Sequence, residues 1–238
     1  MNPYDKLLSR KRTWTPVQTT AGKVTEGAEE VIYRALAIRH MELPVGDFIS
    51  DALNHDVPEL ARPLLLSNVQ DEIKHDLALG YITNSMGVDE KAEEEGKRLR
   101  DAWIAHPDHT ILKALVAERA IFFVLLPFFR FTGDAALRTV SADISRDEQV
   151  HVATNSLVCR ELGLDYSPSL DKLRKATINW VMQPLKANNT NKYLNKKFWL
   201  DSSDRLMYEG KAPELVETKR ARMPAFFEHA NQNLPQYA

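Results

Sequence analysis

Apolar side chains recur three and four positions apart along most of this chain, which is the spacing of one buried face of an α-helix. The first helical pattern covers residues 26–42, where the nearby Pro44 is expected to end or kink the helix. A second helix is predicted over residues 59–85, after Pro58. No run shows the alternating period of a β-strand, so the pattern predicts an all-α protein.

The rest of the chain continues the helical pattern, with Gly and Pro residues between the segments. The segment 88–105 is rich in charges of both signs and is interpreted as a solvated helix. Pro127 is expected to interrupt the helix that begins at His109. The further helices are predicted over residues 88–105, 109–131, 135–162, 169–185, 193–208 and 212–231.

Three regions follow from this pattern. Residues 1–24 are polar, show no sustained period and are predicted to form an extended N-terminal arm. Residues 25–165 hold the main core helices, and residues 166–238 are predicted to add helices packed on the same domain.

Composition narrows the function classes. The chain has 238 residues with 31 Lys and Arg against 33 Asp and Glu, a balance that argues against a dedicated nucleic-acid or membrane-surface binder. It has 1 Cys, so no intrachain disulfide and no thiolate cluster is expected. No run is long enough to span a bilayer and no secretory signal is visible, so a cytoplasmic location is expected.

Two short motifs of the same form carry the candidate chemistry. Glu72 and His75 form one Glu-x-x-His, and Glu148 and His151 form the other, each within a predicted helix. Residues three apart share a helix face, so each pair offers a carboxylate and an imidazole to the same point.

Two further acids repeat the arrangement. Glu118 precedes Glu148 by 30 residues, and Glu42 precedes Glu72 by the same 30. Two helix pairs would then each supply one lone Glu and one Glu-x-x-His, the ligand set of the ferritin-like dimetal carboxylate proteins. The candidate metal ligands are therefore Glu42, Glu72, His75, Glu118, Glu148 and His151.

The alternative interpretation is that these residues form buried salt bridges and helix-surface pairs. Glu118 argues against it, because an uncompensated carboxylate among apolar neighbours would cost several kcal/mol of desolvation. The assignment is least secure at Glu42, because three other acids share its predicted helix: Glu26, Glu29 and Glu30. The remaining histidines are interpreted as surface or capping residues: His40, His55, His106, His109 and His229.

Carboxylate and imidazole ligands suit divalent ions of intermediate softness. We expect two metal ions. A pair of iron ions is the first choice, and a manganese–iron pair or two manganese ions are the alternatives. Glu118 and Glu148 are the expected bridging or shifting carboxylates. Zinc would bind to such ligands but has no redox chemistry.

These motifs resemble the small, radical-generating subunit of class I ribonucleotide reductase over roughly residues 14–164. Three segments carry the resemblance: Ser145–His151, Glu118–Val124 and Pro58–His75. It implies a ferritin-like four-helix bundle with additional C-terminal helices, the six ligands above, and a homodimer. It also implies that Asp147 holds a metal-bound histidine, expected to be His75, and that Trp14 completes an electron-transfer chain.

The chain departs from that family at the radical-bearing residue. The family's tyrosine would fall at position 79, which is leucine here, and Tyr81 lies about 200° further round the helix. The expected surroundings of the metals are apolar and are interpreted as either a substrate pocket or ordinary core: Leu79, Phe122, Leu126 and Ile144.

Three functions are consistent with these residues. The first is a dioxygen-activating dimetal oxidoreductase that oxidises a small molecule or a protein side chain. The second is a short reductase subunit that stores the oxidising equivalent on the metals and serves a large partner subunit. The third is an iron-handling or non-catalytic helical binding protein. No nucleic-acid or membrane partner is expected in any of the three.

Overall fold

The computed structural model describes residues 2–55 and 57–215. Within these ranges the regular elements are helices and there is no β-strand; one isolated parallel bridge joins Lys186 to Asn195. The all-α prediction is confirmed for the described part of the chain.

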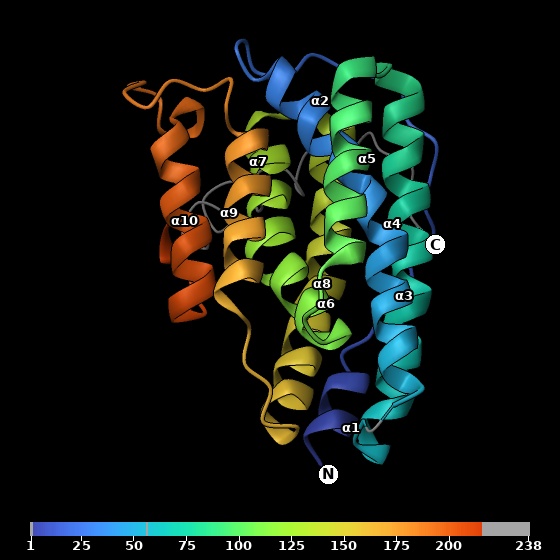
Figure 1. The fold of residues 1–238 in the computed structure, drawn as a ribbon. Coiled ribbons are helices and arrows are strands. Elements are labelled where there is room, and N and C mark those ends of the chain that lie inside the picture. The colour runs from blue at the N-terminus through green and yellow to red at the C-terminus, as the bar shows by residue number, and fades with distance from the viewer. Residues whose placement is uncertain (1, 56, 216–238) are drawn as a thin grey trace.

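Four helical segments form a closed ring at the centre of the molecule (Figure 1). They are α3 (Glu42–Leu53), α4 (Arg62–Met86), α6 (Thr110–Ala117) continued by α7 (Phe123–Thr132), and α8 (Ala135–Glu161). Helix α3 packs against α4 and α6, and α8 packs against α4, α6 and α7. Their inward faces bury most of the apolar core, which drives the assembly.

The other helices cover this ring from outside. Helix α2 (Glu29–Ala37) packs against α5 (Glu90–Ala105), and α9 (Pro168–Val181) packs against α10 (Lys196–Glu209). Figure 1 shows α9 and α10 together on one side of the molecule, where α10 contacts α7.

A side-chain cap fixes the start of α8, whereas α3 and α4 begin without one. The Asp134 carboxylate accepts hydrogen bonds from the Leu137 N–H at 2.8 Å, which begins α8, and from the Gly22 N–H at 2.6 Å, which ties down the N-terminal segment. Helix α4 ends at Gly87, whose φ of 84° favours glycine.

The N-terminal arm is not wholly extended, contrary to the prediction. Residues Pro3–Leu8 form helix α1, with Asn2 capping its first turn and proline at its first position. Tyr4 and Leu7 are buried against the main bundle, and the Tyr4 hydroxyl donates to Glu161 at 2.9 Å. Burial of these two side chains holds a helix too short to be stable alone.

Glu42 begins a new helix instead of ending the first one. The segment 26–42, predicted as one helix, contains α2 and a 3₁₀ turn over Ile38–Met41, and α3 then continues to Leu53, beyond the predicted end. Pro44 lies in the first turn of α3, where its missing N–H would have no intrahelical partner in any case. The helix does break close to Pro44, as expected, but the proline lies in the first turn of the next helix and does not itself end the first one.

The third core helix is interrupted at Glu118 instead of at Pro127. A π-helical segment over Glu118–Phe122 separates α6 from α7, while Pro127 lies within α7. Such segments insert a residue into the helical repeat and occur frequently at functional sites. Residues 118–122 are called the π-segment below.

Two expectations concern the extent of the elements. Most of the helix predicted over residues 212–231 lies outside the described residues. Within the described part, no helix combines the length and the apolar character needed to cross a membrane.

Candidate metal centre

The ring of helices brings the six predicted ligands together in its interior. Each of the four helical segments contributes: α3 gives its first residue, the π-segment gives its first residue, and α4 and α8 each give a Glu-x-x-His. All six side chains are at most 2% exposed. They are Glu42, Glu72, His75, Glu118, Glu148 and His151.

Close packing of α3 on α4 helps to bring the first two acids together. Gly46 lies four residues after Glu42, on the same face of α3. A Cβ atom at Gly46 would lie 3.3 Å from the Glu72 Cβ, so the missing side chain permits this close approach. The three other acids considered for this position, Glu26, Glu29 and Glu30, are exposed. The structure therefore selects Glu42.

The ligand atoms fall into two overlapping groups. Within the described residues, Glu42, Glu72, His75 and Glu148 form one group, and Glu72 joins Glu118 and His151 in the other. The ligand atoms of each group lie within 4.8 Å of one another. We call these groups the first and the second position.

Two carboxylates span both positions. Glu72 directs Oε2 toward His75 Nδ1 at 3.6 Å and Oε1 toward His151 Nδ1 at 2.9 Å. Glu148 directs Oε1 toward His75 Nδ1 at 3.3 Å and Oε2 toward His151 Nδ1 at 3.7 Å. A carboxylate with one oxygen at each position is placed to bridge two cations.

Glu118 approaches only one of the two histidines, and its expected role as a bridging or shifting carboxylate in the metal-bound protein stays a prediction. Its Oε1 lies 3.7 Å from His151 Nδ1, and its Oε2 accepts a hydrogen bond from the Asn155 amide at 2.8 Å. Glu72 thus lies between the two histidines, whereas Glu118 belongs to the second position alone. Glu42 lies on the opposite side, 3.6 Å from His75 Nδ1.

The inward-facing atoms of these residues lack hydrogen-bond partners. Of the 14 buried side-chain N and O atoms without a hydrogen bond in the described part of the chain, 8 belong to these six residues. Carboxylates have no proton to share with one another, and an unsatisfied buried polar atom costs about 1–3 kcal/mol, more if charged. Bound cations would satisfy all of these atoms at once.

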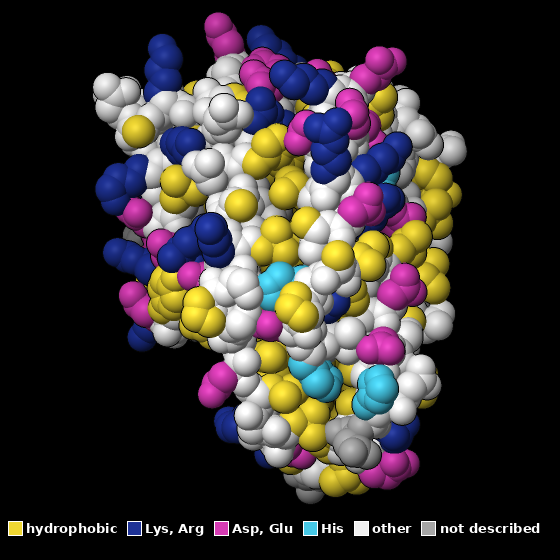
Figure 2. Space-filling view, in the orientation of Figure 1, with side chains coloured by type: hydrophobic (Ala, Val, Ile, Leu, Met, Phe, Trp, Pro, Cys, Tyr) yellow, Lys and Arg dark blue, Asp and Glu magenta, His cyan; other side chains and the backbone are white. Residues whose placement is uncertain are grey.

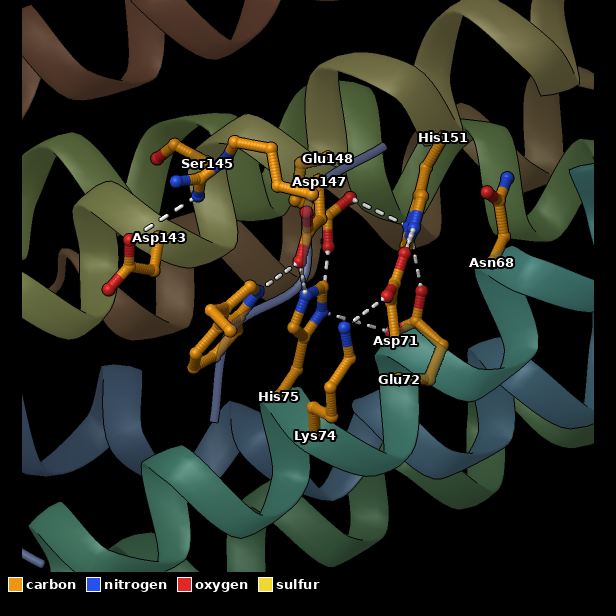
Figure 3. Close-up of polar contacts among 12 residues, drawn as sticks. Asn68, Asp71, Glu72, Lys74, His75, Asp143, Ser145, Asp147, Glu148 and His151 are labelled. Carbon is orange, nitrogen blue, oxygen red and sulfur yellow. Dashed lines mark hydrogen bonds and ion pairs between the residues drawn. The ribbon is translucent and has the colours of Figure 1, made fainter. Parts of the chain in front are cut away.

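Both imidazoles turn the same nitrogen inward. Nδ1 of each faces the acids, while Nε2 faces a carboxylate outside the centre, as Figure 3 shows for His75 with Asp147 and for His151 with Asp71. A carboxylate can only accept, so Nε2 carries a proton, and Nδ1 is the nitrogen that would ligate a metal ion once it has lost its own proton.

Asp147 and Trp14 stand where the resemblance implies. The Asp147 Oδ2 lies 3.3 Å from His75 Nε2 and accepts from the Trp14 Nε1–H at 2.6 Å. The Trp14 and His75 rings are stacked with centroids 6.2 Å apart. A continuous hydrogen-bonded chain therefore leads from the N-terminal arm to the first position.

Asp71 is the counterpart of Asp147, and the sequence analysis missed it. Its Oδ2 lies 3.0 Å from His151 Nε2, and it pairs with Lys11 from the arm and with Lys74 from its own helix. The signal was available, because an Asp precedes the Glu in both Glu-x-x-His motifs. The support is reciprocal: α8 holds the histidine of α4, and α4 holds the histidine of α8.

Burial and the nearby charged histidines have opposite effects on the pKa values of the four glutamates. Burial raises the pKa values of Glu42, Glu118 and Glu148. Burial also acts to raise the pKa of Glu72, but its contacts with both histidines outweigh it and the pKa is lowered. In the metal-free protein the contacts with both histidines therefore favour the ionised form of Glu72, while burial shifts the other three glutamates in the opposite direction.

The histidines favour the charged form when no metal is bound. Burial lowers the pKa of His75, but hydrogen bonds to Asp147 and Glu148 reverse this and raise it. Burial likewise opposes the charge on His151, yet Glu148 and Asp71 raise its pKa to about 10. Protons thus occupy the places that metal ions would take.

The four apolar residues expected around the metals are all in the core. Leu79, Phe122, Leu126 and Ile144 are each at most 4% exposed. Phe122 closes the π-segment, and Leu126 follows it by one turn. Their use as a substrate pocket stays a prediction.

A separate cavity of about 500 Å³ opens near the start of α6 and contains none of the six residues. Figure 2 shows histidine side chains gathered on this part of the visible face. His109 caps α6 by accepting from the Ile111 N–H at 3.2 Å, as its interpretation as a capping residue required. The lining residues are Asp51, His55, Asp108, His109, Thr110, Leu162 and Leu164.

Comparison with known proteins adds no relative: the chain matches no protein-family model and no curated protein.

Proposed function

We propose that this chain is a ferritin-like dimetal carboxylate protein that activates dioxygen to oxidise a small molecule or a protein side chain. One observation carries the proposal: eight buried ligand atoms without hydrogen bonds converge from four helices, with Glu72 and Glu148 each offering one oxygen to each histidine. Stability alone does not account for this arrangement, because burying four ionisable carboxyl groups and two imidazoles costs desolvation free energy that their mutual contacts only partly offset.

The residues fit a pair of iron or manganese ions. Oxygen and imidazole ligands without thiolate suit these metals, and both Nδ1 atoms can ligate once they have lost their protons. When bound, such a pair would supply the electrons with which dioxygen is reduced. The chain's own part is to hold the ions, keep bulk water out and fix the histidines through Asp147 and Asp71.

A second function is favoured by one specific observation. The chain Trp14–Asp147–His75 leads from the arm to the first position and matches the electron path that the resemblance to the reductase small subunit implies. In this alternative the chain serves a large reductase subunit and stores the oxidising equivalent on the metals. The apolar neighbours of the centre favour the oxidase instead, since they leave no phenol facing it.

The direct test is metal loading. Purified metal-free protein incubated anaerobically with ferrous iron is expected to bind two ions per chain, measured by elemental analysis after removal of free metal. Admission of air should then oxidise the iron, seen as new near-ultraviolet absorbance. Binding of less than one ion per chain under saturating metal would contradict the proposal.

Repeated turnover separates the candidate functions. With an excess of reductant, an oxidase is expected to consume many equivalents of dioxygen per metal pair, and more in the presence of its substrate. The excess reductant can also re-reduce a reductase subunit or an iron-handling protein, so for these the consumption of dioxygen is expected to stay unchanged when candidate small-molecule substrates are added. Measurement with an oxygen electrode decides between these outcomes.

Metal binding is also expected to release protons at neutral pH. His75 and His151 both have raised pKa values in the metal-free protein, and each must lose its Nδ1 proton to ligate. We expect about two protons released per metal pair, plus any from the protonated glutamates. Titration calorimetry in buffers of different ionisation enthalpy measures this number; a value near zero would show that the ions bind elsewhere.

A further inference from the structure

The C-terminal helices make a buried contact with the π-segment that the proposed function does not use. Helices α9 and α10 both pack on residues 118–122. Ser203, on α10, donates a hydrogen bond from its hydroxyl to the backbone carbonyl of Ala120 at 2.7 Å. Both residues are fully buried, so this bond links a remote helix to the backbone two residues after Glu118.

Arg174 fixes the direction of that bond. Its Nη1 donates to the Ser203 hydroxyl oxygen at 2.8 Å, and the arginine itself is only 1% exposed. Arginine has no acceptor, so the serine oxygen must accept from it and must send its own proton onward to Ala120. Asp171 and Asp204 hold the guanidinium at 2.6 and 2.7 Å.

The neighbouring Ser202 forms a hydrogen bond within its own helix instead. The Ser202 hydroxyl bonds to the carbonyl of Phe198, four residues earlier in its own helix, and to the Glu214 carboxylate. Helical serines commonly make this local bond. Ser203 instead bonds across to the π-segment, with Arg174 behind it.

The geometry of the π-segment determines where Glu118 points. One inserted residue rotates the helix before it relative to the helix after it by about 100°. Helix α7 is anchored on α10 through Phe128, whose ring lies 5.2 Å from that of Trp199. If the π-segment relaxed to α-helix against this anchor, Glu118 would turn away from His151 by about that angle.

We propose that Arg174 and Ser203 form a positioning relay that stabilises the π-helical conformation of residues 118–122 and thereby keeps Glu118 at the second metal position. The relay rests on the proposed function, because it needs a metal site for Glu118 to serve. It touches neither the ligands nor the first position, so it acts on one ion of the pair.

The test is Ser203→Ala, with Ser202→Ala as the matched control. We expect Ser203→Ala to weaken binding of the second Mn²⁺ ion by roughly 10- to 100-fold, the usual effect of removing an outer support of a ligand. Binding of the first ion should be unchanged. Calorimetry resolves the two steps, and electron paramagnetic resonance distinguishes a coupled Mn²⁺ pair from a lone ion. Ser202→Ala should bind both ions as the wild type does.

A second measurement needs no metal. Hydrogen exchange of the backbone amides in residues 118–124 should be faster in metal-free Ser203→Ala than in the wild type, and unchanged in Ser202→Ala. If the wild type binds two ions and Ser203→Ala binds both equally well, the relay is wrong while the proposed function stands. If the wild type binds no pair of ions, the proposed function fails, and the exchange data still show whether Ser203 holds the π-segment.

Discussion

Glu72→Gln is expected to abolish binding of both metal ions, whereas Glu118→Gln is expected to leave one. Glu72 faces both histidines and belongs to both ligand groups, while Glu118 approaches only His151. Glutamine keeps the shape of the side chain but removes its charge, and it can offer only one oxygen to the two positions. Elemental analysis at saturating metal should give about zero ions per chain for Glu72→Gln and about one for Glu118→Gln.

A matched control is Glu93→Gln, which removes an acid paired with Arg39 and His40 away from the centre. This variant should bind two ions. Equal metal content in Glu72→Gln and the wild type would show that the cluster is a set of salt bridges. Equal loss in Glu72→Gln and Glu118→Gln would show that the second position cannot be emptied by itself.

Without metal, Glu118→Gln should be more stable than the wild type at neutral pH, by about 1–3 kcal/mol. Burial raises the pKa of Glu118 in the folded state, so the folded protein holds a proton that the unfolded chain releases. Stability from this group therefore falls as pH rises above the unfolded value near 4.5. The advantage of the variant should shrink as pH is lowered toward that value, as denaturant unfolding at several pH values would show.

The sequence predicted which six residues meet in the core, largely because the two Glu-x-x-His pairs obey a local rule. The Glu-x-x-His spacing places both groups on one helix face, and the repeated 30-residue offset brings Glu42 and Glu118 to the same level. No local rule predicted how the six residues divide between the first and the second position. Which glutamates face both histidines depends on how four helices meet: Glu72 and Glu148 do so, while Glu118 approaches only His151.

The elements missed were those fixed by tertiary contacts. The π-segment has no side-chain signature, and its partner Ser203 lies more than eighty residues away. Lys11 reaches Asp71 from the N-terminal arm, where the sequence analysis had assigned a role only to Trp14. Pro44 indicated the break but not the helix to which it belongs, because proline is equally compatible with ending one helix and with the first turn of the next.

Loading with ferrous iron and air is expected to produce no persistent tyrosyl radical. A radical of this kind needs a phenol that faces the metals. Residue 79 lies one turn after His75, on the same face of α4, and it is a buried leucine. Tyr81 is two residues further, about 200° round the helix, and is partly exposed. Electron paramagnetic resonance of the oxidised protein measures the outcome directly.

Two substitutions at residue 79 test this expectation in both directions. Leu79→Tyr puts a phenol on the face of His75 and should give a tyrosyl signal after loading, whereas Leu79→Phe fills the same space without a hydroxyl and should give none. Tyr81→Phe should match the wild type. A persistent signal in the wild type that Tyr81→Phe removes would overturn the helix-face assignment and would favour the reductase-subunit alternative.

Trp14 is the one aromatic side chain hydrogen-bonded into the centre within the described residues, through Asp147. Its ring also makes a cation–π contact, because the Lys74 ammonium lies 5.5 Å from the indole centroid. A positive charge there stabilises the neutral indole and opposes its oxidation to a radical cation. We therefore expect no persistent tryptophan radical in the wild type, and the oxidising equivalent should be consumed by added reductant or substrate. A lasting indole signal that disappears in Trp14→Phe would instead make the arm an electron path to a partner.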